Sequence, residues 1–230
     1  MYSFEHGMIE KGNFQAFLAA SSITESQDEE SIVVGTSSGE LYQLVPQGIN
    51  FQSELKYKTQ DNSGISGLSF DPKSRVLALG LTSGVVAGIE LAKGGWEPTL
   101  MAESLNETPL ISLRCLQRGE NLFVAAFANG MVRIMKPDLQ KLLEVSCHSR
   151  QINALSVSAN ASLFATCGDD TFVNIWEVSG QGDKLRVSHF LGSRINDMMI
   201  VGVSFGGAAA RSIVAVPYDY AQMLVWENCV

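Results

Sequence analysis

Residues 35–39 read Gly-Thr-Ser-Ser-Gly, a match to the Gly-x-Ser-x-Gly pattern that presents a nucleophilic serine in some hydrolases. That chemistry needs Ser37 at the head of a helix, because the first turn of the helix supplies the oxyanion donors. The residues that follow, ELYQLV, alternate between polar and apolar side chains, which is typical of a strand. We therefore interpret the stretch as a hairpin turn in which Gly39 adopts a positive φ, and Ser37 as no nucleophile.

His148 and Asp170 form a second candidate for chemistry, since a carboxylate orients the histidine in many acid–base sites. The adjacent Asp169 and Asp170 would offer oxygen ligands to a cation, but hard metals need more ligands than one turn supplies. The sequence also lacks a HExxH motif, a P-loop and a dinucleotide-binding fingerprint. We expect no catalytic residue, no metal site and no cofactor, and hence no enzyme.

Composition and charge narrow the remaining function classes. The chain has 230 residues, 46% of them hydrophobic, and a formal net charge of −8 with its 16 basic residues scattered, which argues against a nucleic-acid partner. Its longest apolar run, residues 122–132, is too short to insert into a membrane. Four cysteines (Cys115, Cys147, Cys167 and Cys229) lack zinc-type spacing, and the N-terminus shows no secretory signal. These features predict reduced thiols and a cytoplasmic location.

A repeat becomes visible when the turns are aligned. Five stretches each consist of an apolar strand, a short turn and a second strand, and the residues that open the second strand are Gly39, Gly84, Gly130, Thr171 and Ala221. A large apolar residue follows five positions later in every copy: Leu44, Ile89, Met135, Trp176 and Trp226. Four-stranded units of this length, apolar on both faces, are typical of a β-propeller, in which neighbouring sheets cover one another.

We therefore expect an all-β fold: one propeller domain over residues 1–230 with about five four-stranded blades. The blades are placed near residues 11–60, 61–105, 106–147, 148–191 and 192–230. The last unit ends after its third strand. Two alternatives for closure stay open: a strand from residues 1–10 completes the last blade, or the chain is part of a larger ring.

The fourth unit, CHSRQINALSVSANASLFATCGDDTFVNIWEV (147–178), resembles a WD repeat. The resemblance places His148, Thr166, Asp170 and Trp176 on the family's structural tetrad, a buried hydrogen-bonded chain from indole to hydroxyl to imidazole to carboxylate. The other units depart from that pattern, with Ser38, Ser83, Asn129 and Tyr220 at the position of the aspartate. The tetrad explains His148 and Asp170 better than acid–base catalysis does, because it accounts for two further residues as well.

In WD propellers one face of the ring, built from the loops before each first strand and the turns between second and third strands, commonly binds peptides or proteins. The resemblance implies that this face includes Lys58, Phe127, Arg150, Asp169, Arg194, Tyr218 and Tyr220. Arginine and tyrosine are enriched among residues that dominate binding energies. The alternative interpretation is that these side chains only pack against neighbouring loops.

The family resemblance implies a non-enzymatic scaffold that binds protein or peptide partners through these loops. One alternative is a structural subunit of a ciliary or trafficking assembly, with a vesicle- or cilium-associated location. A small-molecule or enzymatic site in the central channel is a further alternative, although no converging polar groups indicate one. Open blade faces would also favour self-association or additional blades that close the ring.

Overall fold

The computed structural model describes residues 17–26, 29–48, 50–102, 108–159, 162–206 and 212–227. The predicted N-terminal strand at residues 1–10 lies outside the described residues. Within the described part the regular structure is almost entirely strands, apart from two short 3₁₀ turns, η1 (Leu91–Lys93) and η2 (Gly182–Lys184). No helix among these residues has the length and apolar character needed to cross a bilayer.

The strands form five antiparallel sheets, each built from strands that are consecutive in the sequence. The first sheet contains β1 (Phe17–Ser26), β2 (Glu29–Thr36), β3 (Glu40–Gln47) and β4 (Asn50–Lys58). The second contains β5 (Ile65–Asp71), β6 (Val76–Leu81), β7 (Val86–Glu90) and β8 (Leu100–Ala102). The third contains β9 (Leu110–Leu116), β10 (Leu122–Phe127), β11 (Met131–Met135) and β12 (Lys141–Ser146).

The fourth sheet contains β13 (Ile152–Val157), β14 (Leu163–Gly168), β15 (Phe172–Ser179) and β16 (Arg186–Arg194). The fifth contains three described strands, β17 (Ile200–Gly206), β18 (Ser212–Pro217) and β19 (Leu224–Trp226). The expected all-β propeller architecture is confirmed.

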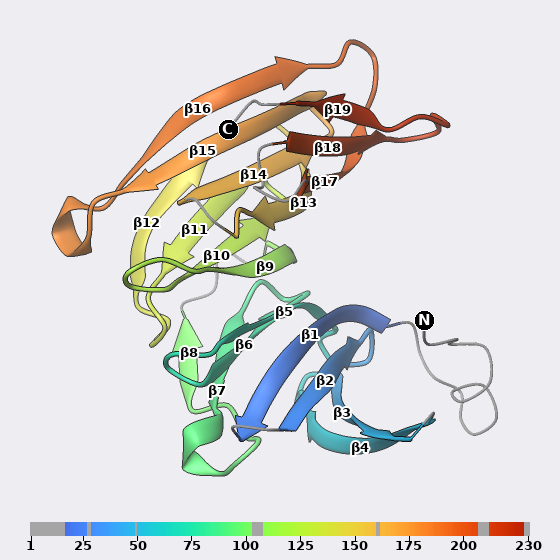
Figure 1. The fold of residues 1–230 in the computed structure, drawn as a ribbon, viewed down its shortest axis with the longest axis vertical. Helices are drawn as coiled ribbons and strands as arrows, with labels where there is room; N and C mark the ends of the chain where they lie inside the picture. The colour runs from blue at the N-terminus through green and yellow to red at the C-terminus, as the bar shows by residue number, and fades with distance from the viewer. Residues whose placement is uncertain are drawn as a thin grey trace.

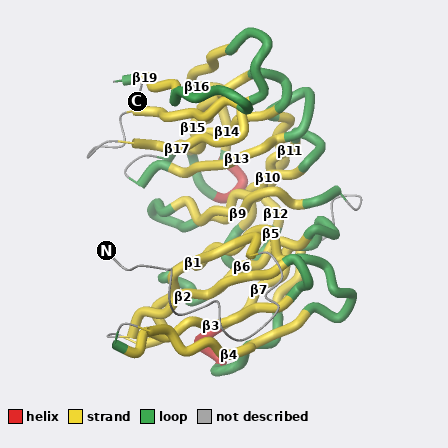
Figure 2. The backbone as a smooth tube through the Cα atoms, turned by 90° about the vertical axis from the view of Figure 1, so that its right-hand side faces the viewer, coloured by secondary structure: helices red, strands yellow, loops and turns green. Residues whose placement is uncertain are grey.

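The sheets stack face to face, and their first strands lie side by side along the inner edge (Figures 1 and 2). β1 packs against β5, β5 against β9, β9 against β13, and β13 against β17. Among the described residues, no comparable packing joins the fifth sheet to the first. The five sheets therefore form an open arc.

The second strands explain why the sheets need one another. VLALGL in β6, LFVAAF in β10 and LFATCG in β14 are buried at all six positions. Because side chains alternate between the two faces of a strand, such a strand must be covered on both sides. Each of the four hydrophobic clusters accordingly joins residues of two neighbouring sheets.

The turns between second and third strands follow the predicted repeat in four sheets. Gly39, Gly84, Gly130 and Thr171 all have positive φ, between 73° and 85°. At Gly130 a Cβ atom would lie 2.2 Å from the carbonyl oxygen of His148, because the turn packs directly against the loop that leads to the next sheet. Glycine is therefore required there by its conformation and by the close approach.

The fifth sheet departs from this alignment. The sequence places Ala221 at the start of the third strand, but β19 begins at Leu224. Positive φ falls on Asp219 instead. The placement of Ala221 was wrong because the turn after β18 is longer than the turns of the other sheets, which a fixed offset cannot anticipate.

Candidate functional site

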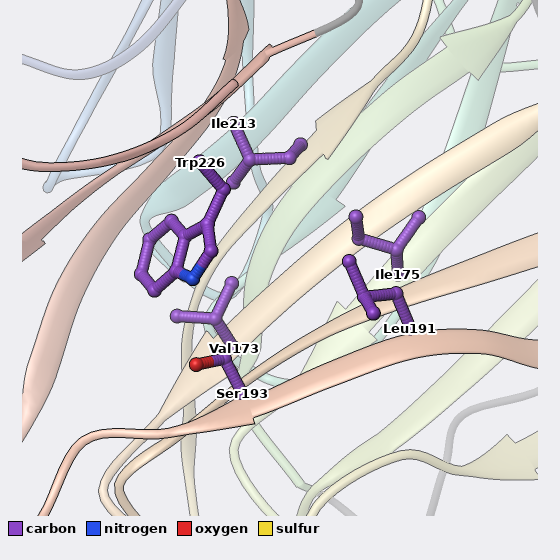
Figure 3. A pocket seen from close by; sticks show the side chains of 6 residues that line it. All are labelled: Val173, Ile175, Leu191, Ser193, Ile213 and Trp226. Atoms are coloured by element: carbon purple, nitrogen blue, oxygen red, sulfur yellow. The ribbon is translucent and has the colours of Figure 1, made fainter. Parts of the chain in front are cut away.

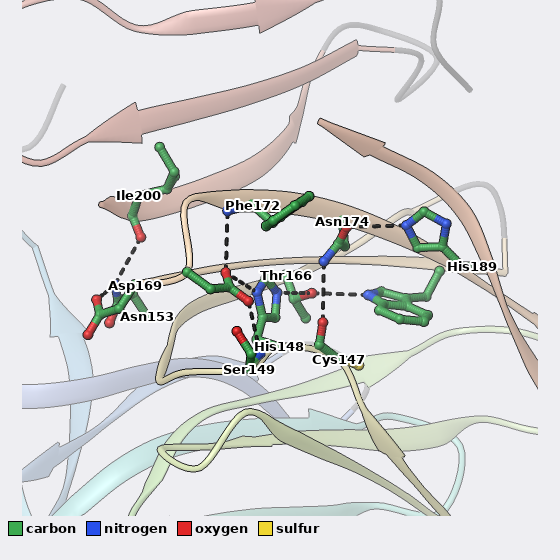
Figure 4. Close-up of polar contacts among 12 residues, drawn as sticks. Cys147, His148, Ser149, Asn153, Thr166, Asp169, Phe172, Asn174, His189 and Ile200 are labelled. Atoms are coloured by element: carbon green, nitrogen blue, oxygen red, sulfur yellow. Dashed lines mark hydrogen bonds and ion pairs between the residues drawn. The ribbon is translucent and has the colours of Figure 1, made fainter. Parts of the chain in front are cut away.

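The four predicted tetrad residues are hydrogen-bonded in the expected order, and Figure 4 labels His148 and Thr166 at the middle of the series. Trp176 Nε1 donates to Thr166 Oγ1 at 3.1 Å. Thr166 Oγ1 lies 2.8 Å from His148 Nε2, and His148 Nδ1 lies 2.8 Å from Asp170 Oδ1. The hydroxyl accepts the indole proton and can donate its own to Nε2, which leaves Nδ1 to donate to the carboxylate. The indole N–H, the hydroxyl and both ring nitrogens then each have a hydrogen-bond partner.

This arrangement does not suit His148 for acid–base work. Both ring nitrogens have partners, and the side chain is fully buried. A general base must reach a proton of the substrate, which a buried imidazole held between Thr166 and Asp170 does not do. The geometry instead favours a role in fixing the loop before β13 to the turn between β14 and β15.

Asp170 completes that role through its backbone partners. Its Oδ2 accepts a hydrogen bond from the Ser149 amide at 3.0 Å, and its Oδ1 accepts one from the Phe172 amide at 3.3 Å. In the third sheet the residue at the same turn position, Asn129, bonds only locally, to the Met131 amide. Among the described residues, the full set of hydrogen bonds from indole to carboxylate is found in the fourth sheet, as its sequence indicated.

A second polar group beside the tetrad was not predicted. Asn174 donates from Nδ2 to the carbonyl oxygen of Cys147 at 3.3 Å, and its Oδ1 lies 3.2 Å from His189 Nε2. The imidazole of His189 packs edge-on against the indole of Trp176, with 5.1 Å between ring centroids. The group anchors β16 to the tetrad. The position of Asn174 on a strand that is apolar around it was the available signal, since a buried amide needs partners.

Backbone hydrogen bonds join the loops at one edge of the last two sheets. The Asp169 amide donates to the Gln151 carbonyl, the Ile195 amide to the Thr171 carbonyl, and the Tyr218 amide to the Met199 carbonyl, at 2.8–3.0 Å. We call these loops, residues 148–151, 169–171, 195–199 and 218–220, the loop edge. It is a connected surface of backbone-anchored turns.

Most of the predicted partner-binding residues are solvent-accessible on or next to the loop edge. Tyr218 and Tyr220 expose 63% and 42% of their surface, and Arg150 and Arg194 are exposed. Asp169 is half-buried and accepts a hydrogen bond from Asn153 at 2.7 Å. These positions are compatible with contact to a partner.

Two predicted residues lie outside the loop edge. Lys58 ends β4 of the first sheet and pairs at 3.2 Å with Glu40, the first residue of β3, so it lies beside the turn between β2 and β3 of its own sheet. Phe127 is fully buried, and the prediction that it faces a partner was wrong. It is the last residue of β10, which is buried along its whole length. The Arg133 guanidinium lies over the Phe127 ring, with 5.6 Å between the guanidinium carbon and the ring centroid.

Ser37 is an exposed residue of the hairpin turn between β2 and β3. The Gly39 amide closes the turn on the Thr36 carbonyl at 3.2 Å, and Gly39 has a φ of 79°. A strand follows rather than a helix. The interpretation of this stretch as a turn is confirmed.

A series of hydrogen bonds between turns at the opposite edge of the sheets was also not predicted from the sequence. Lys73 Nζ in the second sheet donates to the carbonyl oxygens of Arg118 and Gly119 in the turn between β9 and β10. Arg118 in turn donates to the carbonyl oxygens of Val178 and Gly180 in the fourth sheet. Three consecutive sheets are thus bonded through their turns. The sequence showed these segments only as turn-forming connectors.

Besides an open groove of about 300 Å³ between the second and third sheets, the described part of the chain contains two further hollows. A groove of about 390 Å³ lies between the first two sheets, lined by residues that include Tyr57, Asp61, Ser83, Glu97 and Met101. Burial, followed by the charges of Glu97 and Asp61, raises the pKa of the Tyr57 hydroxyl. The Tyr57 phenol therefore stays protonated at neutral pH.

The second hollow is a small apolar pocket between the fourth and fifth sheets (Figure 3). Its walls are Val173, Ile175, Leu191, Ser193, Ile213 and Trp226. With a volume of about 10 Å³, it has no room for a small-molecule substrate.

Comparison with known proteins supports the fold and identifies relatives. A family model described as WDR54 matches residues 85–228, more than half of the chain. The chain is 28% identical to WD repeat domain 54 of Rattus norvegicus over 47% of its own length and 34% of that protein. It is 27% identical to WD repeat-containing protein 54 of Mus musculus over 52% of its own length and 37% of that protein. The match thus spans about a third of the length of these relatives.

Solved structures show the same architecture. The WD40 β-propeller domain of Doa1 superposes with a TM-score of 0.69 at 15% identity, covering 95% of this chain and 67% of that domain. A chain of an active polycomb repressive complex 2 gives a TM-score of 0.75 at 12% identity, covering 92% of this chain and 48% of that one. At these identities the likeness establishes the fold. Together with the family match, it shows that the chain belongs to the WDR54 family of WD-repeat β-propeller proteins.

Proposed function

We propose that this chain is a non-enzymatic scaffold that binds protein or peptide partners through its loop edge. WD-repeat propellers generally mediate protein interactions. The observation that carries the proposal is the turn between β18 and β19, in which Tyr218 and Tyr220 flank Asp219 and expose their side chains to solvent.

Backbone hydrogen bonding fixes the position of this turn. Its backbone is tied to the preceding loop by the hydrogen bond from the Tyr218 amide to the Met199 carbonyl at 2.8 Å, and Asp219 has a φ of 53°. Tyr220 donates its hydroxyl to Gln222 Oε1 at 3.2 Å within the turn, and both tyrosine rings remain exposed. A phenol ring on an anchored turn gives a large contact area for a small loss of side-chain entropy, which is why tyrosine is frequent in binding hot spots.

The surroundings of the turn add charge. Arg150 and Arg194 are exposed on the neighbouring loop and strand end. Each presents a guanidinium that can bond a carboxylate in a bidentate manner. A partner segment with an aromatic-binding apolar patch and an acidic residue would fit this combination of tyrosine and arginine.

The test compares three purified chains as baits: the natural chain, a Tyr218→Ala/Tyr220→Ala double variant, and a Leu55→Ala control. Leu55 is 50% exposed on β4, away from the loop edge. We expect proteins captured by the natural chain and the control to be lost from the double variant. With a purified partner, affinity should fall by about tenfold or more, the effect of removing a hot spot. Equal capture and affinity for all three chains would contradict the proposal.

A further inference from the structure

The groove between the first two sheets can be compared, position by position, with the tetrad of the fourth sheet. The first strands of the second and fourth sheets enter their ladders alike, with Ile65 opposite Leu81 and Ile152 opposite Gly168. In both ladders the register shifts directly after that pair. Loop and turn residues of the two sheets can therefore be aligned by counting from these pairs.

Two residues of the groove take the positions of tetrad residues on this alignment. Asp61 stands four residues before the paired residue of the first strand, as His148 does. Ser83 stands two residues after the paired residue of the second strand, as Asp170 does. In the fourth sheet an imidazole and a carboxylate join the two positions at 2.8 Å. In the second sheet no hydrogen bond among the described residues joins them, and both residues line a groove of about 390 Å³.

The hydroxyl of Ser83 is an unpartnered group in the wall of this groove. Its Oγ is buried and has no hydrogen-bond partner among the described residues. Ser83 as a whole is only partly buried, so rotation of its side chain can turn the hydroxyl into the groove. Because a buried hydroxyl without a partner is unfavourable, this position favours a ligand that can bond it.

The charged residues that line the groove are both acidic. Asp61 follows β4, and Glu97 lies in the loop that leads to β8. Hydrogen bonds from the side chain and backbone of Ser63 lower the pKa of Asp61, so its carboxylate is ionised at neutral pH. Glu97 is exposed and has no ion pair among the described residues. The groove therefore attracts a cation.

The lysines near the groove do not supply that cation. Lys56 lies 5.4 Å from the centroid of the Trp96 ring and pairs with Glu54 at 2.8 Å. Lys58 is likewise paired with a carboxylate. Residues 103–107, which follow β8 and lie outside the described residues, contain two glutamates and no basic residue. The sequence next to the groove thus adds negative charge.

The other walls of the groove suit the stem of a long side chain. Tyr57 is half-buried, and Leu81, Val85, Pro98 and Met101 add apolar surface. Met101 is 64% exposed. An aromatic ring beside carboxylates is a combination that binds a guanidinium, because the ring stacks on its plane and the carboxylates accept its N–H groups.

We propose that the groove receives an arginine side chain of a partner protein. This inference rests on the proposed function, since it describes a second contact of the same scaffold. A guanidinium has five N–H donors, enough for Asp61, Glu97 and the Ser83 hydroxyl, whereas a lysine ammonium has three and stacks less well on a ring. The volume of about 390 Å³ lies in the range of sites that enclose a ligand.

The groove and the loop edge select different chemistry. The loop edge presents arginine and tyrosine side chains of the last two sheets, whereas the groove presents carboxylates of the first two sheets. The two contacts can therefore be tested separately.

The first test titrates Nα-acetyl-arginine amide into the isotope-labelled chain and follows its backbone amide resonances by NMR. We expect saturable shifts at Asp61, Ser83 and Val85, with a dissociation constant of roughly 1 mM for so small a ligand. Nα-acetyl-lysine amide should bind about threefold more weakly or worse. Nα-acetyl-glutamine amide, which has no charge, should produce no saturable shift.

A matched pair of variants tests the charge of the groove. Asp61→Asn/Glu97→Gln removes the two carboxylates of the groove, and the asparagine can still accept the Ser63 amide. Glu177→Gln/Asp183→Asn removes two exposed carboxylates of the fourth sheet and changes the net charge equally. We expect the groove variant to weaken the arginine probe about tenfold or more, and the control to change its affinity by less than about twofold.

A third variant separates this proposal from the one for the loop edge. Tyr218→Ala/Tyr220→Ala should bind the arginine probe as the natural chain does, so either proposal can fail without the other. Three results would overturn the arginine site: no saturable shift at the groove, equal binding of the glutamine and arginine probes, or equal weakening by the two charge variants.

Discussion

Asn121 of the third sheet donates its side-chain amide to the carboxylate of Asp71 in the second sheet at 2.6 Å, and both residues are buried. Burial alone would raise the pKa of Asp71. Hydrogen bonds from the Ser74 hydroxyl, the Asn121 amide and the Lys73 and Ser74 backbone outweigh it and hold the pKa below its ordinary value. The bond therefore makes the contact between two sheets sensitive to acid.

Asp71→Asn should reduce stability at pH 7 and weaken its dependence on pH. Because the pKa of Asp71 is lower in the folded state, its contribution is present above the ordinary aspartate value near 3.9 and is lost as pH falls through the folded value. Urea midpoints between pH 7 and pH 2 should show the natural chain and the variant converging at the acid end. Two parallel curves would exclude this role for Asp71.

Asp170→Ala should lower the free energy of unfolding by about 1–3 kcal/mol, because it leaves the buried His148 ring and the Ser149 amide without their acceptor. Ser37→Ala is the matched control: it removes an exposed turn hydroxyl and should change the free energy by less than about 0.5 kcal/mol. Chemical denaturation of both variants checks the difference. Equal free energies of unfolding for the two variants would mean that the tetrad contributes nothing to stability.

Thr171→Gly should stabilise the chain by roughly 0.5–1 kcal/mol. Thr171 is a β-branched residue at a φ of 73°, and its Oγ1 is buried without a hydrogen-bond partner among the described residues. Three other sheets have glycine at this position of the turn. We expect the backbone strain that glycine relieves at this positive φ to exceed, by a small amount, the extra conformational entropy that glycine loses on folding. A lower thermal midpoint in the variant would show that Thr171 is not strained.

Cys115 and Cys167 should resist thiol reagents in the folded protein. Burial raises the pKa of both thiols to about 12, so almost no thiolate is present at neutral pH, and burial likewise raises the pKa of Cys147. In a Cys229→Ser background, labelling by a disulfide reagent should become rapid only in denaturant. Rapid labelling of the native chain would contradict the raised pKa of these three thiols.

The sequence predicted the parts of the fold that depend on local patterning. Apolar second strands and glycine turns recur at a nearly constant offset, so periodicity alone was enough to place the turns at Gly39, Gly84 and Gly130. The tetrad was predicted through the resemblance of residues 147–178 to a WD repeat, which assigns these roles to His148, Thr166, Asp170 and Trp176. Phe127 was misjudged because its place beside a turn did not reveal that β10 remains buried to its last residue.

Contacts between sheets could not be predicted in the same way. Asn121 reaches Asp71 across 50 residues of sequence, and nothing in the spacing of two polar turn residues pairs them. The Asn174–His189 group depends likewise on the register of β15 against β16. The exposure of Val216 and Val225 likewise could not be predicted, because both belong to strands whose apolar pattern matches that of the buried strands.

The central claim, that each sheet is held by the sheet that follows it, can be tested with one matched pair of substitutions. Gly67→Val places a side chain where Leu110 and Leu113 already pack, whereas Gly202→Val places the same side chain at the same strand position of the uncovered fifth sheet. Denaturant unfolding at about 1 µM should show a loss of about 2–3 kcal/mol for Gly67→Val and less than about 0.5 kcal/mol for Gly202→Val. Equal losses for the two variants would contradict the account.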